Sequence, residues 1–149
     1  MAAALRQQLG CLFSVTAASL LLAFLPHLTY ASQRTPVEVW RTGDDGLTLK
    51  ISEAVETAFR ASPAFILSSG RKSGTLIVTL PTNVDWKRVG KRTQVQYSVQ
   101  FTSIHEEKLG SKAGVCWENS PQDCAAQIVK AAVTAANRLR VAAGNSDGQ

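Results

Sequence analysis

The strongest constraint on the fold is an alternation of apolar and polar residues between positions 94 and 102. The apolar positions are Val95, Tyr97, Val99 and Phe101, and polar side chains occupy the positions between them. Successive side chains of a β-strand point to opposite faces, so this strand has one buried face and one solvated face. That pattern favours an antiparallel sheet over a doubly wound parallel sheet, whose strands are buried on both sides.

Two segments have the periodicity of amphipathic helices. The first begins after Asp45, a residue suited to N-capping, and must end before Pro63. The second follows Ser120, with Pro121 in the first helical position and Gly144 as a suitable C-terminal residue. Apolar residues recur at helical spacing in both segments: Leu47, Ile51, Val55 and Ala58 in the first, and Cys124, Ile128, Ala131, Ala132, Ala135 and Leu139 in the second.

Shorter apolar stretches predict the remaining strands. Residues 32–41 are expected to form an edge strand, followed by strands at 64–68 and 75–80, a turn at 104–109 and a last strand at 113–117. The sequence therefore predicts an α+β fold, with an antiparallel sheet of four to five strands and two helices packed on one face. We expect one domain over 32–144 and a flexible tail over 145–149.

The N-terminal residues have the order of a cleavable signal peptide. Arg6 lies in a short charged region, residues 11–25 are mostly apolar, and Thr29-Tyr30-Ala31 offers small residues for cleavage between Ala31 and Ser32. The alternative is a retained membrane anchor, but the apolar run is shorter than the roughly 20 residues that a spanning helix needs. We therefore expect removal of residues 1–31 and a periplasmic or secreted protein.

Cysteine usage agrees with export. Removal of residues 1–31 takes away Cys11 and leaves Cys116 and Cys124, which are close enough in sequence to form a structural disulfide in an oxidising compartment. Zinc binding would need several Cys or His ligands at fixed spacings. The mature chain keeps only His105 beside this pair, so we expect no metal and no cofactor.

The same histidine bears on catalysis. His105 stands beside Glu106 and Glu107 in a predicted turn, and no nucleophile motif or phosphate-binding loop accompanies it. We expect a protein that is not an enzyme, with a small hydrolase as the third-ranked alternative.

A basic cluster is the most distinctive local feature of the mature chain. Lys87, Arg88, Lys91 and Arg92 follow Trp86 in a predicted loop, within a chain of net charge +5. Such a cluster suits phosphates, sulfates or anionic glycan and lipid head groups. The simpler interpretation, which we favour, is a solvated loop that protects a sheet edge.

The tryptophans raise a similar choice between burial and binding. Trp117, beside the predicted disulfide, is expected to be buried against the helices. Trp40 and Trp86 lie near predicted strand ends and are the candidates for an interface.

The mature chain resembles small periplasmic α/β domains of bacterial envelope machinery, such as the N-terminal domain of TolB and modules of secretion lipoproteins. The matching segments are Ile51-Ser52-Glu53-Ala54-Val55, Ser62-Pro63-Ala64-Phe65, Thr75-Leu76-Ile77-Val78, the strand around Tyr97 and Phe101, and the alanine-rich closing helix. The resemblance implies an exported, non-enzymatic binding or assembly component of the envelope, with a protein partner. The alternative is a periplasmic binder of anionic glycan or lipid head groups. We expect no nucleic-acid partner, and membrane contact only through the signal peptide before cleavage.

Overall fold

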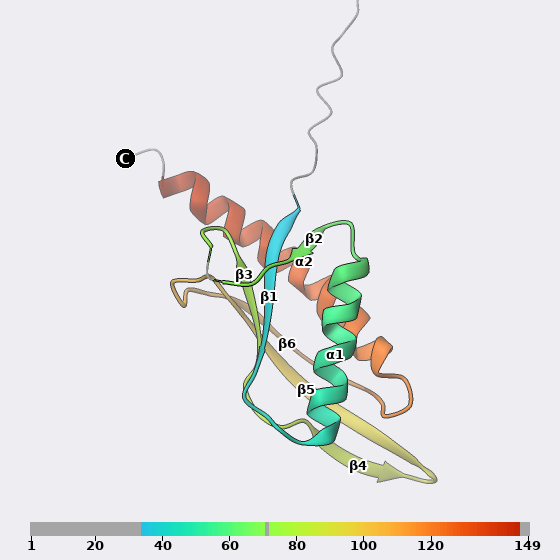
Figure 1. Ribbon diagram of the computed structural model, residues 1–149. Coiled ribbons are helices and arrows are strands. Elements are labelled where there is room, and N and C mark those ends of the chain that lie inside the picture. Colours follow the sequence, from blue (N-terminus) through green and yellow to red (C-terminus); the bar gives the residue numbers. More distant parts are fainter. Residues whose placement is uncertain (1–33, 71, 147–149) are drawn as a thin grey trace, which may run out of the picture.

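The computed structural model describes residues 34–70 and 72–146, so the predicted signal peptide and its cleavage site between Ala31 and Ser32 lie outside the described residues. The described chain forms two helices and a six-stranded sheet, which confirms the α+β class (Figure 1). In chain order the elements are β1 (Thr35–Arg41), α1 (Gly46–Ala61), β2 (Phe65–Leu67), β3 (Leu76–Leu80), β4 (Asp85–Val89), β5 (Arg92–Thr102), β6 (Lys108–Trp117) and α2 (Pro121–Ser146).

β1 lies inside the sheet rather than at its edge. It pairs in parallel with β2 on one side and with β3 on the other, whereas the pairs β3–β5, β4–β5 and β5–β6 are antiparallel. The sheet is thus mixed, unlike the predicted antiparallel sheet of four to five strands, and the prediction of an edge strand at 32–41 is wrong. The reason is α1, which supplies the crossover that a parallel pair requires and delivers β2 to the outer side of β1.

β3 and β4 follow one another along the same side of β5. Thr79 pairs with Gln100 and Asp85 pairs with Gln96, so five residues lie between these pairs on this side and three lie between them on β5. The extra residues interrupt the ladder around Pro81, which has no N–H to donate. β4 therefore continues the line of β3 and projects with the start of β5 as a hairpin at one end of the molecule (Figure 1).

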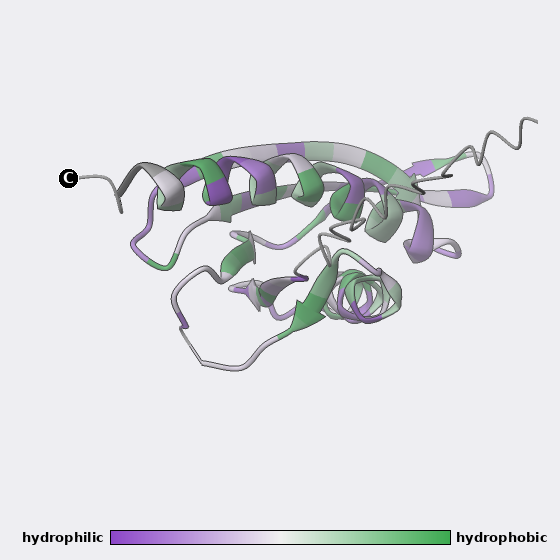
Figure 2. Cartoon of the chain, turned by 90° about the horizontal axis from the view of Figure 1, so that it is seen from above, coloured by the Kyte–Doolittle hydropathy of each residue, from purple (hydrophilic) through white to green (hydrophobic). Residues whose placement is uncertain are grey.

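The core lies between the sheet and the two helices. The alternation on β5 is confirmed: Val95, Tyr97, Val99 and Phe101 are buried, and Gln96, Ser98 and Gln100, which alternate with them, are exposed. α1 packs against β1 and β2, α2 packs against β5 and β6, and the two helices contact each other. Figure 2 shows α1 nearly end-on and α2 lengthwise, so the axes of the two helices are inclined to one another.

Gly114 on β6 allows the largest buried side chain to fit. Tyr97 pairs with Gly114 across the sheet, is 1% exposed, and donates its hydroxyl to Gln127 Oε1 on α2 at 3.3 Å. A Cβ atom at position 114 would lie 2.5 Å from the Tyr97 hydroxyl oxygen, which is closer than non-bonded atoms can approach. Burial also raises the pKa of the Tyr97 hydroxyl above its ordinary value.

The N-terminal cap of α1 forms as predicted. One oxygen of the Asp45 carboxylate accepts hydrogen bonds from the backbone N–H groups of Leu47 and Thr48, at 2.9 and 3.0 Å. The buried hydroxyl of Thr48 donates to the other carboxylate oxygen and accepts from the N–H of Val84 at 2.9 Å. These hydrogen bonds, above all the one from the Thr48 hydroxyl, hold the pKa of Asp45 below its ordinary value.

α2 begins at Pro121 as predicted, but it does not end at Gly144. The helix continues to Ser146, and the remainder of the predicted tail, 147–149, lies outside the described residues. Small and apolar residues form its buried side: Cys124, Ala125, Ile128, Ala132, Ala135, Ala136 and Leu139. The last strand before it is longer than predicted, because β6 already begins at Lys108.

Candidate functional site

The predicted basic loop is a β-hairpin. Lys87 and Arg88 belong to β4, Lys91 lies in the turn, and Arg92 begins β5. Val89 pairs with Arg92, and Gly90 between them has a φ of 62°, which a two-residue hairpin turn requires and glycine adopts without strain. The prediction of a loop is thus wrong, because all five residues of β4 are exposed and no buried alternation marks the strand.

Strand alternation divides the cluster between two faces of the hairpin. Trp86 pairs with Val95, whose side chain is buried toward the helices, so Trp86 and Arg88 lie on the helix side of the sheet. Lys87 pairs with Gln94 and lies on the opposite face. The four cations of the sequence cluster therefore do not form a single surface.

A hollow of about 270 Å³ lies on the helix side of the hairpin, and we call it the basic hollow. Its lining residues are Lys50, Arg88, Lys91, Arg92, Thr93, Glu118 and Asn119. The structure thus brings three of the four predicted cations together and adds Lys50 from α1, while Lys87 is not part of the lining. With four cations and one carboxylate, the lining has a formal charge of +3.

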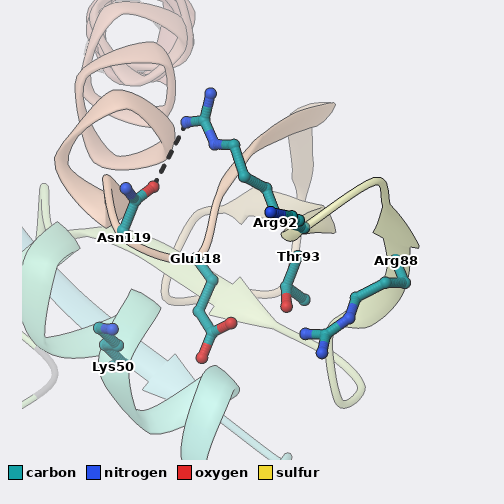
Figure 3. Close-up of a pocket in the computed structure, with 7 residues that line it drawn as sticks. Lys50, Arg88, Arg92, Thr93, Glu118 and Asn119 are labelled. Atoms are coloured by element: carbon teal, nitrogen blue, oxygen red, sulfur yellow. Dashed lines mark hydrogen bonds between the residues drawn. The ribbon is translucent and has the colours of Figure 1, made fainter.

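Side chains from three parts of the fold meet in the basic hollow (Figure 3). Lys50 comes from α1, Arg88 from β4, and Glu118 and Asn119 from the connection between β6 and α2. The connection is attached to the hairpin, because the backbone N–H of Glu118 donates to the carbonyl oxygen of Thr93 at 3.0 Å. The Glu118 carboxylate lies among the cations, where an anionic ligand would have to compete with it.

Arg92 is the cation with the most contacts. Its guanidinium carbon lies 4.0 Å from the centroid of the Trp117 ring, and its Nη2 donates to Asn119 Oδ1 at 3.4 Å. A guanidinium over an indole face is favoured by the ring quadrupole. Trp117 lies on the face of the sheet away from the helices, so these two contacts turn the guanidinium of Arg92 away from Lys50 and Arg88 in the hollow.

The predicted disulfide between Cys116 and Cys124 is confirmed. It joins the end of β6 to the first turn of α2, with 8 residues of sequence separation, and Cys124 has no exposed surface. The connection that carries Glu118 and Asn119 lies between the two cysteines. The disulfide therefore holds one wall of the basic hollow in place.

The three tryptophans occupy different surroundings. Trp86 is 64% exposed, and its place in an interface stays a prediction. Trp117 is half-buried, but it alternates with the inward-facing Cys116 and therefore lies on the face away from the helices, unlike the prediction. Trp40 is also half-buried and lines a second hollow of about 240 Å³, together with Ile77, Thr79, Thr102, Ser103, Ile104 and Glu106.

His105 lies exposed in the turn between β5 and β6. The hydroxyl of Ser103 organises this turn by accepting hydrogen bonds from the backbone N–H groups of His105 and Glu107, both at 3.2 Å. Among residues 34–70 and 72–146, no three His, Cys, Asp or Glu side chains are grouped so that they could hold a metal ion. Within the same residues, no helix has the length and apolar character needed to span a bilayer.

Sequence reasoning missed Lys50 as a member of the site. Lys50 lies on the exposed side of α1, far along the chain from the cations of the hairpin. The residue pattern of α1 predicts that this side chain faces solvent, and it does. Only the packing of α1 beside the hairpin brings it to the hollow.

No protein-family model and no curated protein matches the chain. Among solved structures, the chain is similar to a minor lipoprotein from Acinetobacter baumannii, with 11% sequence identity and a TM-score of 0.51. The match covers 70% of this chain and 92% of the lipoprotein chain. At this identity the likeness is one of fold.

Proposed function

We propose that this chain is an exported, non-catalytic binding or assembly component of the bacterial cell envelope. The observation that carries the proposal is the Cys116–Cys124 disulfide, because such bonds persist in oxidising compartments and are rare in the cytosol. The signal-like residues 1–31 supply a route to such a compartment. The fold shared with a minor lipoprotein supports the same setting.

The proposed partner is another envelope protein, and the sheet face away from the helices is the surface that suits it. Gln96, Ser98 and Gln100 are exposed there along β5. Trp40, a predicted interface residue, lines the second hollow at one end of the same face. Polar side chains around a recessed aromatic residue are compatible with a moderately polar protein interface.

A second candidate function is the binding of anionic glycan or lipid head groups in the basic hollow. It is favoured by Lys50, which comes from α1 and adds a cation to those of the hairpin at one place. Convergence of charge from separate elements is not needed for a hairpin that is merely solvated. It raises the local attraction for phosphate or sulfate groups.

The test is expression of the full chain in an exporting bacterium, followed by cell fractionation, intact-mass measurement and co-purification at low and high salt. We expect recovery from the periplasmic fraction with Ser32 as the first residue, whereas a control with Leu21→Arg and Leu22→Arg should remain unprocessed. A partner retained at high salt supports the protein-assembly function, and salt-sensitive retention of anionic material supports the second candidate. Cytoplasmic recovery with Met1–Ala31 intact would contradict export.

A further inference from the structure

We propose that the hairpin face carrying Trp86 and the basic hollow is a docking surface for an anionic lipid membrane. The domain would contact the phosphate groups of the lipid heads through its cations, while the Trp86 indole enters the interfacial region. The proposal makes the second candidate function specific, and it rests on the proposed envelope location.

The charge of the surface matches a layer of phosphates. Lys50, Arg88 and Lys91 are exposed and line the basic hollow, against the single carboxylate of Glu118. Each basic residue close to an anionic bilayer adds a separate, salt-dependent attraction. Three converging cations can thus bind several head groups at once, which one isolated lysine cannot do.

Part of this surface is ordered before a ligand arrives. The disulfide and the hydrogen bond from Glu118 to Thr93 fix the wall of the hollow that faces Lys50 and Arg88. Arg92 is held over the Trp117 ring on the other face of the hairpin, so its guanidinium does not belong to the docking surface. The cations are therefore presented from a rigid frame.

Trp86 distinguishes a lipid surface from a soluble anion. Its side chain is 64% exposed and lies on the same face of β4 as Arg88. An indole beside cations has no role in holding a free phosphate, but tryptophan favours the membrane interface, where its apolar ring and polar N–H are both accommodated. Val89, 44% exposed at the end of β4, adds apolar surface at the tip of the hairpin.

The position of the hairpin permits such contact. β4 lies at one end of the molecule, and the C-terminal end of α2 lies at the other (Figure 1). A flat bilayer can therefore approach the hairpin without displacing the packed helices.

The proposal is tested by sedimentation of the protein, as recovered from exporting cells, with phosphatidylcholine vesicles that contain or lack phosphatidylglycerol. We expect binding only to the anionic vesicles and a shift of tryptophan emission to shorter wavelength, which Trp86→Ser should abolish. The triple variant K50Q/R88Q/K91Q should bind about 100-fold more weakly, since each cation near the surface contributes about fivefold. The charge-matched control K72Q/K108Q/K130Q removes three exposed lysines elsewhere and should lose less than about fivefold.

A pair of single variants protects the test against misfolding. Arg88→Gln and Lys87→Gln change neighbouring residues of a strand that is exposed throughout, but only Arg88 faces the hollow. We expect the larger loss of vesicle binding from Arg88→Gln. The proposal would be overturned by equal losses of vesicle binding from the two triple variants. It would also be overturned if the protein bound soluble heparin as tightly as vesicles and Trp86→Ser did not change that binding. Such a result would leave export intact, because fractionation measures export separately.

Discussion

Replacing both disulfide cysteines by alanine tests how much the bond between β6 and α2 contributes to the stability of the domain. The two cysteines are separated by 8 residues, and closing a loop of that length in the unfolded chain corresponds to about 2.5 kcal/mol of stabilisation. Cys124 is fully buried and Cys116 is 6% exposed, so removal of the sulfur atoms also leaves a small void worth roughly 0.5 kcal/mol. We expect C116A/C124A to lower the free energy of unfolding by about 3 kcal/mol.

The assay is thermal and urea unfolding of the exported protein, followed by circular dichroism. For a domain of this size, about 3 kcal/mol corresponds to a fall in Tm of roughly 12 °C. When the wild type is unfolded in the presence of a reductant, its Tm should approach that of the double variant. Val115→Thr serves as the control on β6, because Val115 is 46% exposed and its replacement should change stability by less than about 0.5 kcal/mol.

Two outcomes would refute the reasoning about the disulfide. One is a Tm for the double variant within about 3 °C of the wild type, which would mean that the bridge adds little to the packing around it. The other is the detection of two reactive thiols in native exported protein. The second result would also remove the main support for an oxidising location, because it would mean that the bond is not formed.

Two further substitutions test the packing around Tyr97 and the helix cap. Gly114→Ala should lower the free energy of unfolding by about 2 kcal/mol, because its Cβ would overlap the buried Tyr97 side chain. The control Gly144→Ala meets open space and should be neutral or slightly stabilising in the same melts. Equal Tm values for the two variants would contradict this packing. Thr48→Val should cost about 2 kcal/mol by leaving a buried N–H without a partner, and Thr48→Ser should restore most of it; stability unchanged in Thr48→Val would contradict the contact. The pKa of Asp45 in the folded protein is lowered from 3.8, so the stability that its carboxylate adds is present above pH 3.8 and is lost as the pH falls through the folded pKa. Thr48→Val removes the hydrogen bond that lowers this pKa most, so its free energy of unfolding should fall less on acidification.

Local chemistry made several elements predictable from the sequence. Asp45 caps α1, and Pro121 starts α2, because each position has steric and hydrogen-bonding demands that few residue types meet. The alternation on β5 also predicts its buried face, since one side of that strand meets the helices and the other side meets water. The disulfide could be predicted because removal of the expected signal peptide leaves one pair of cysteines.

The parts that could not be predicted depend on tertiary pairing. β4 carries no apolar alternation, because both of its faces are exposed and its place in the sheet depends on the ladder with β5. β1 carries no sign that it lies between two strands, since β2, its outer neighbour, has only three residues. Lys50 has the sequence pattern of any solvent-facing helical lysine, so its membership of the basic hollow follows only from the packing of α1 beside the hairpin.

The disulfide and the basic hollow are physically linked. Directly after Cys116 come Trp117, which supports Arg92, then Glu118, which donates its N–H to Thr93, and Asn119, which accepts from Arg92. The bridge to Cys124 closes this segment into a short loop, so the residues that order Arg92 are held by the same bond that stabilises the domain. In a reducing compartment this wall would lose its covalent constraint. The wall of the hollow that carries Glu118 is therefore best maintained in the oxidising setting where an exported protein would meet anionic envelope lipids.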